Sequence, residues 1–120
     1  MLSLNTVMIH SEDPTALAAF YTKVLGEPGF EGNGYTGWKA GNGFVMVGPH
    51  SEVKGQNEMP GRIIINLETA DVAGEFARLK DQGASVKQEP YEPGEGMTLA
   101  TFEDPDGNLF QLASPMPESM

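Results

Sequence analysis

Few side chains in this sequence point to a specific chemistry. Cysteine is absent, which excludes disulfides, thiol nucleophiles and thiolate metal sites. His10 and His50 are the two histidines, and neither has a carboxylate at ligand spacing, so they form no recognisable metal motif. A histidine at a strand end is usually solvated or hydrogen-bonded, and the alternative for His10 is a ligand contact or a general base.

Two further patterns resemble functional motifs without meeting their requirements. Residues 32–37 match the bare pattern GxGxxG. A dinucleotide fingerprint needs a strand before that pattern and a helix opening within it, whereas here a helix and loop come first and a strand-like stretch follows. We therefore interpret the match as chance, and we assign the carboxylates of Glu103 and Asp104 to turn chemistry.

The composition describes an acidic chain that can build one ordinary core. The chain has 120 residues, 39% of them hydrophobic, and a formal net charge of −10. Because that charge repels phosphates, neither nucleic acid nor an anionic membrane is an expected partner. It favours a cationic ligand, although an acidic surface also serves solubility. No apolar run has the length of a membrane span or the flanks of a signal peptide, so we expect a cytoplasmic protein.

The first half of the chain has the pattern of a strand, a helix and a hairpin. Alternation of apolar residues predicts a strand over residues 5–9. Asp13 and Pro14 can open a helix, and Gly26 can end it. Residues 34–39 and 44–47 then form two strands, since the Gly-Asn-Gly between them is a strong hairpin signal.

The second half repeats this order. Residues 62–67 alternate as a strand, and Thr69 or Asp71 can cap a helix that ends at Gly83. Strands are predicted over residues 84–87, 97–103 and 109–113, with the turn Asp-Pro-Asp-Gly between the last two. Residues 89–96 are expected to be an irregular loop and residues 115–120 a frayed tail.

These elements predict an α+β fold in a single domain of residues 1–120. Module one covers residues 1–50 or so, a polar connector covers about 48–61, and module two covers about 61–115. A repeat of this length is too long for a solenoid unit. It indicates two similar modules that pack side by side, because each is too small to bury its apolar face alone.

Three segments carry a resemblance to a known superfamily. DPTALAAFYTKVLG (residues 13–26), DVAGEFARLKDQG (71–83) and FEDPDGNLFQL (102–112) are similar to the vicinal oxygen chelate superfamily of glyoxalases, bleomycin-resistance proteins and extradiol dioxygenases. The resemblance spans nearly the whole chain. It implies two βαβββ modules that form a cupped mixed sheet around a central cavity, usually in a homodimer. In catalytic members, four side chains hold one divalent cation there, most often through His or Glu.

The positions that match those metal ligands carry the wrong side chains. Counted from the motifs, they are Thr6, Met46, Ile64 and Gln111, with Val47 in place of Met46 if the first hairpin is shifted. A divalent site needs roughly three good protein donors, and only the Gln111 amide offers a workable one. We therefore expect no metal and no cofactor.

Strand parity predicts which side chains line the cavity that the resemblance implies. Apolar and aromatic residues with a few fixed polar groups are typical of a small-molecule pocket. The predicted ligand-binding residues are Thr6, Met8, His10, Trp38, Phe44, Met46, Arg62, Ile64, Asn66, Leu99, Thr101, Glu103 and Gln111, and Leu109 shares their face. Three of these assignments have alternatives. Trp38 can instead pack under a helix, and Arg62 can be a solvated residue at the start of a strand. The methionines can simply fill the core.

The sequence therefore favours a metal-free small-molecule-binding protein over an enzyme. A bleomycin-resistance type of protein, which sequesters a drug or metabolite, fits this pattern. An alternative is a lyase, isomerase or dioxygenase-like enzyme with an absent or relocated metal, in which His10, Glu103 or Arg62 performs acid–base work. A second alternative is a dimeric structural module whose cavity is filled.

Overall fold

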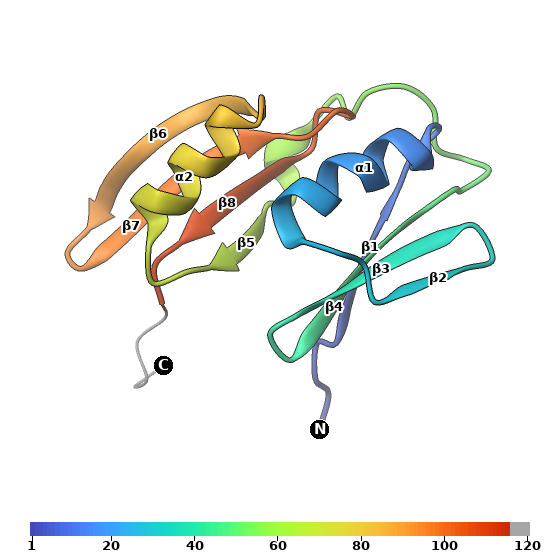
Figure 1. The fold of residues 1–120 in the computed structure, drawn as a ribbon, viewed down its shortest axis with the longest axis horizontal. Helices are drawn as coiled ribbons and strands as arrows, with labels where there is room; N and C mark the ends of the chain where they lie inside the picture. The colour runs from blue at the N-terminus through green and yellow to red at the C-terminus, as the bar shows by residue number, and fades with distance from the viewer. Residues whose placement is uncertain (116–120) are drawn as a thin grey trace. The chain divides into compact units, whose positions relative to one another are not determined.

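Each half of the chain builds its own four-stranded mixed sheet with one helix. The computed structural model describes residues 1–115 (Figure 1). It divides into two compact units, Met1–Gln56 and a second unit that begins at Asn57, and the division falls within the predicted connector. The α+β class and the pair of βαβββ modules are confirmed. The predicted tail from residue 116 lies outside the described residues.

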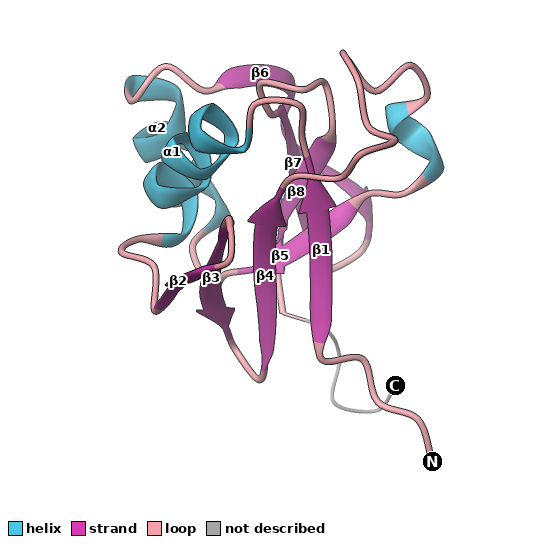
Figure 2. Ribbon diagram, turned by 90° about the vertical axis from the view of Figure 1, so that its right-hand side faces the viewer, coloured by secondary structure: helices cyan, strands magenta, loops and turns pink. Residues whose placement is uncertain are grey.

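The first unit places the strand that opens the chain beside the strand that closes the hairpin. Its elements are β1 (Thr6–His10), α1 (Pro14–Leu25), β2 (Phe30–Gly32), β3 (Tyr35–Ala40) and β4 (Gly43–Gly48). The strand order is β1-β4-β3-β2. β1 and β4 run parallel, and the other pairs are antiparallel. Figure 2 shows β1 and β4 side by side with the same direction.

The helix of this unit begins and ends as its sequence predicts. The Asp13 carboxylate accepts a hydrogen bond from the Ala16 backbone N–H at 3.2 Å, which caps the helix, and Pro14 occupies the first turn. Gly26, with a φ of 92°, follows the last helical residue. The helix buries Leu17 and Tyr21 against the sheet.

The second unit has the same arrangement with a longer outer strand. Its elements are a 3₁₀ helix η1 (Pro60–Arg62), β5 (Ile65–Glu68), α2 (Val72–Asp81), β6 (Ser85–Gly94), β7 (Met97–Glu103) and β8 (Leu109–Ala113). The strand order is β5-β8-β7-β6, in which β5 and β8 are parallel. The rings of Phe76, Phe102 and Phe110 pack in sequence from α2 across the sheet, with Phe102 and Phe110 stacked at 5.5 Å.

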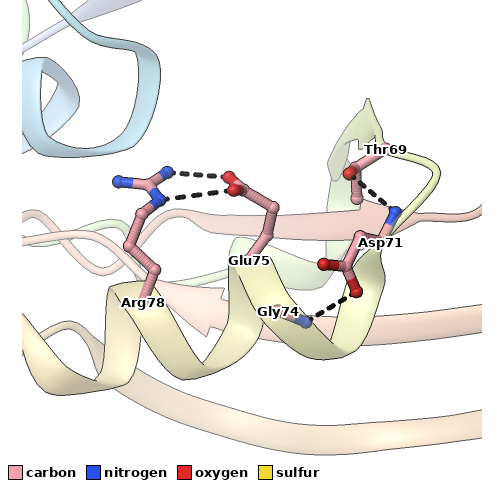
Figure 3. A network of polar contacts seen from close by, with 5 residues as sticks. All are labelled: Thr69, Asp71, Gly74, Glu75 and Arg78. Carbon is pink, nitrogen blue, oxygen red and sulfur yellow. Dashed lines mark hydrogen bonds and ion pairs between the residues drawn. The ribbon is translucent and has the colours of Figure 1, made fainter.

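Asp71, rather than Thr69, caps α2. Its carboxylate accepts from the Gly74 backbone N–H at 2.9 Å, while the Thr69 hydroxyl accepts from the Asp71 N–H at 3.1 Å (Figure 3). Farther along the helix, Arg78 and Glu75 form an ion pair with a 2.8 Å contact. The two polar residues before the helix therefore act together to fix its first turn.

Two predicted segments differ clearly from the structure, and one strand was missed. The strand expected from residue 62 starts at Ile65, because Pro60 opens η1 and the Arg62 N–H donates to the Met59 carbonyl. The expected loop at 89–96 is mostly strand: β6 runs to Gly94 with three register shifts. β6 is an edge strand, where prolines are tolerated and bulges restore pairing. The short β2 was not predicted.

The glycine-rich stretch at residues 32–37 forms a hairpin and no nucleotide loop. Asn33 and Gly34 have φ values of 55° and 83°, the signs that a two-residue type I′ turn requires. Gly32 pairs with Tyr35 across this turn. Among residues 1–115, no helix has the length and apolarity needed to cross a membrane.

Candidate functional site

The sheet of the first unit has one face covered by α1 and one open face. Register pairs Met8 with Met46 and Thr6 with Phe44 across β1 and β4, and paired residues share a face. Met8 is 51% exposed and Phe44 46% exposed, whereas Val45 and Val47, which alternate with Phe44 and Met46 along β4, are buried. We call the side that carries these exposed residues the open face of unit 1; its members are Thr6, Met8, His10, Phe30, Tyr35, Lys39, Phe44 and Met46.

Trp38 does not belong to this face. It pairs with Val45, is 1% exposed, and donates from Nε1 to the Gly26 carbonyl at 2.8 Å. Its ring also contacts that of Tyr21 on α1. The alternative of packing under a helix is therefore the observed one, and Lys39 takes the place on the open face. The same register puts Met46 on the open face and Val47 on the covered face.

The second unit has a corresponding open face. Gln111 lies between Asn66 on β5 and Thr101 on β7, in register with both. Leu99 and Glu103 flank Thr101 with the same parity, and Leu109 pairs with Glu103. These side chains point away from the Phe102–Phe110 stack on the covered face. The open face of unit 2 is thus Asn66, Leu99, Thr101, Glu103, Leu109 and Gln111, of which Thr101 is buried at 5% exposure.

Two predicted site residues of this unit lie outside the sheet. Arg62 belongs to η1, is exposed, and has its Nη2 3.5 Å from the Met59 sulfur. The expectation of an inward-facing Arg62 on a strand was therefore wrong. Ile64 precedes β5 and is 38% exposed.

The side chains at the family's metal positions do not fit a divalent cation. Thr6 and Met46 lie in the first unit, and Ile64 and Gln111 in the second. The Thr6 hydroxyl donates to the Asn5 amide oxygen at 2.7 Å, a thioether is a poor ligand for such ions, and isoleucine has no donor atom. Within residues 1–115, no three His, Cys, Asp or Glu side chains are grouped to hold an ion. These four positions therefore do not support chemistry through a family-type metal.

Sequence reasoning missed a cluster at the end of the open face of unit 1. His10 Nε2 lies 3.0 Å from the Tyr35 hydroxyl, and the His10 and His50 rings are 5.1 Å apart between centroids. Counting pairs outward from the hairpin turn would have placed Tyr35 beside Gly48, which pairs with His10. The position of His50, in the segment after β4, had no such signal.

Comparisons with known proteins agree with this architecture. A family model described as a glyoxalase-like domain matches residues 6–113. A glyoxalase/bleomycin resistance protein/dioxygenase family enzyme from Burkholderia phytofirmans PsJN has a TM-score of 0.76 at 21% identity, covering 96% of this chain and all of its own. A glyoxalase-related enzyme from Fulvimarina pelagi has a TM-score of 0.77 at 18% identity, covering 98% of this chain and 94% of its own.

Two more relatives show how far the likeness extends. TioX from Micromonospora sp. ML1 has a TM-score of 0.73 at 20% identity, covering 95% of this chain and 99% of its own. The uncharacterized protein YurT of Bacillus subtilis (strain 168) is 44% identical over 43 residues, which are 36% of this chain and 33% of that protein. The match thus spans about a third of that curated relative. Because the family model covers nearly all of the sheet-forming region, this chain belongs to the glyoxalase-like domain family within the vicinal oxygen chelate superfamily, whose members bind small molecules.

Proposed function

We propose that this chain binds a small organic molecule without using a metal ion. The observation that carries the proposal is the donor set at the family's metal positions, which holds an amide, a hydroxyl, a thioether and an aliphatic group. Because a divalent ion needs roughly three good donors, the ligand must be held by apolar contact and hydrogen bonds. In each unit, the predicted residues on its own open face are the ones assigned to this role.

The open faces have the composition that a ligand-binding surface requires. In unit 1, exposed Met8 and Phe44 offer apolar and polarisable contact. In unit 2, Asn66 and Gln111 offer amide groups that fix orientation, whereas Thr101 beside Gln111 is only 5% exposed. Apolar surface with a few placed polar groups is the usual make-up of a small-molecule site.

Sequestration rather than turnover is the mode we propose. The description of one relative joins glyoxalase, bleomycin resistance protein and dioxygenase family enzyme. Of these, the bleomycin-resistance type fits best, because binding without chemistry needs no metal. The net charge of −10 attracts cations over a distance of about 10 Å at 0.1 M salt. A cationic drug or metabolite is therefore the proposed ligand class, and a homodimer the proposed assembly.

Metal analysis of the purified protein tests the first part of the proposal. We expect substoichiometric zinc, nickel, manganese and iron, and a melting temperature that a chelator leaves unchanged. A tightly bound ion that binds only the folded state raises stability, so its removal would lower the melting temperature. Stoichiometric metal together with such a decrease would overturn the metal-free proposal.

Ligand binding is best followed at the methionine methyl groups. Met8 and Met46 lie on the open face of unit 1, whereas Trp38 is buried under α1, which makes its fluorescence an indirect reporter. With methyl-labelled methionine, we expect titration with a cationic aromatic compound to shift the Met8 and Met46 signals. The Met1 methyl serves as a control because that side chain is fully exposed at the terminus. Shifts confined to Met1 would contradict the proposal.

A further inference from the structure

Both histidines of the chain meet at one end of the open face of unit 1. His10 is the last residue of β1, and His50 follows the end of β4. Their ring centroids are 5.1 Å apart, and the His10 and Tyr35 rings are 5.9 Å apart, edge to face. Three polar aromatic side chains from separate segments therefore form one group, which we call the imidazole–phenol cluster.

A glycine makes room for this cluster. The ring of Tyr35 lies across Gly48, at the position that a Cβ of residue 48 would occupy. From there its hydroxyl reaches His10 Nε2 at 3.0 Å and the Pro49 carbonyl at 3.4 Å. Any side chain at position 48 would displace the tyrosine. The local backbone is thus suited to hold the hydroxyl beside the imidazole.

The hydrogen bonds limit which atoms of the cluster can donate. His50 Nδ1 accepts from the Glu52 backbone N–H at 3.1 Å, so in the neutral ring the proton is on Nε2. Within residues 1–115, that Nε2–H has no protein acceptor. The 3.0 Å contact between His10 Nε2 and the Tyr35 hydroxyl can run in either direction, depending on the His10 tautomer. In the tautomer with the proton on His10 Nε2, the imidazole donates to the Tyr35 oxygen, and the hydroxyl proton has only the 3.4 Å contact to the Pro49 carbonyl. The Tyr35 hydroxyl in that tautomer and the His50 Nε2–H are the two donors open to a ligand.

A metal chelate explains this arrangement less well. His50 Nδ1 is occupied by a backbone N–H, and His10 Nε2 by a hydroxyl. Moving the proton of His50 from Nε2 to Nδ1 would break the Glu52 bond. No carboxylate or thiolate among residues 1–115 joins the two histidines as a third ligand.

We propose that the imidazole–phenol cluster donates hydrogen bonds to the carbonyl oxygen of an aromatic ligand without negative charge, whose rings lie over Met8, Phe44 and Met46. This inference rests on the proposed small-molecule binding and names the chemical group that the site recognises. Methionine sulfur makes favourable contacts with aromatic rings, and both methionines share the face of the cluster. The overall charge of −10 disfavours a carboxylate in place of a neutral carbonyl.

A pair of probes of equal shape tests this directly. 2-Acetonaphthone carries a carbonyl oxygen, and 2-isopropenylnaphthalene replaces it with a methylene group. Affinities are measured from the Met8 and Met46 methyl shifts. Since a neutral hydrogen bond contributes about 1 kcal/mol, the ketone should bind the unaltered protein about 5- to 10-fold more tightly than the alkene.

Variants then assign the preference to the cluster. Tyr35→Phe keeps the ring over Gly48 and removes the hydroxyl, and His50→Phe removes the second donor. His10→Phe is added because the missing hydroxyl would free the His10 N–H. In this triple variant the ratio of the two affinities should fall to about 1. His50→Gln, which restores an N–H donor, should recover part of the preference. Methyl spectra of each variant, compared with the unaltered protein, establish that the fold is kept.

The possible failures are distinguishable. If both probes bind the unaltered protein equally, the carbonyl site is overturned while small-molecule binding survives. If the ketone preference persists in the triple variant, another group recognises the oxygen and the inference is also overturned. If neither probe moves the Met8 and Met46 signals, both this inference and binding at the open face of unit 1 fail.

Discussion

Two glycines determine which side chains can lie on the open face of unit 1. A Cβ at Gly37 would lie 2.5 Å from the Met46 sulfur, and one at Gly48 would overlap the Tyr35 ring. Both residues sit in strands, where glycine is otherwise unfavourable. Their presence allows a methionine and a tyrosine to lie flat over the sheet, which gives the face its polarisable and hydrogen-bonding surface.

Replacing Gly48 with alanine should therefore destabilise the fold. We expect Gly48→Ala to lower the free energy of unfolding by about 1–3 kcal/mol, the range of an overpacked site. Chemical denaturation measures the change. Gly29→Ala is the matched control, because a Cβ there meets nothing within 4 Å. In a protein that already carries Tyr35→Ala, the Gly48→Ala substitution should lower the free energy of unfolding by less. A Gly48→Ala protein as stable as the control would show that Tyr35 lies elsewhere.

The site residues were predictable where a strand's parity governs them. Met8 and Gln111 lie on the expected faces, because alternation along a regular strand leaves no other choice. Met46 also lies on its face, but Val47 remained an alternative until the hairpin register was known. Trp38 could not be placed in the same way, since the hairpin register decided between two faces and an aromatic ring suits both. The imidazole–phenol cluster depends on a segment without regular structure, and no periodicity locates His50.

The helices and the hairpin were predictable because their ends carry local signals. Asp13 and Asp71 accept the expected hydrogen bonds at the helix starts. The outer strands β2 and β6 were missed or shortened, since their pairing is set by the neighbouring strand rather than by their own residues. Two prolines and two glycines in residues 89–96 are typical of a loop, and pairing with β7 overrides that preference.

The cap of α2 provides a test of how local such signals are. Asp71→Ala removes the acceptor for the Gly74 N–H and should lower the free energy of unfolding by about 0.5–2 kcal/mol. Asp71→Asn keeps an acceptor oxygen and should therefore retain most of the wild-type stability. Thermal or denaturant unfolding gives the values. Asp81→Ala is the control: it removes a carboxylate at the other end of α2, where a negative charge opposes the helix dipole. A comparable loss for Asp81→Ala would contradict the capping argument.

The charge of the chain bears on how it meets its ligand. Seventeen acidic residues against seven basic ones produce a negative potential that extends far at low ionic strength, about 30 Å at 0.01 M salt and about 3 Å at 1 M. A cation is attracted from a distance by this field, while the hydrogen bonds and apolar contacts of the open faces act only at short range. The two contributions therefore respond differently to salt.

A matched pair of ligands separates these contributions. 2-Naphthylmethylammonium and 2-naphthalenemethanol have the same aromatic body and differ by one charge. Raising the salt from about 0.01 to about 1 M should weaken binding of the cation several-fold and leave the alcohol nearly unchanged, because only the first gains from the long-range field. Titration of the Met8 and Met46 methyl signals measures both. Equal salt dependence for the two compounds would mean that the acidic surface serves solubility alone, and the preference for cationic ligands would have to be abandoned.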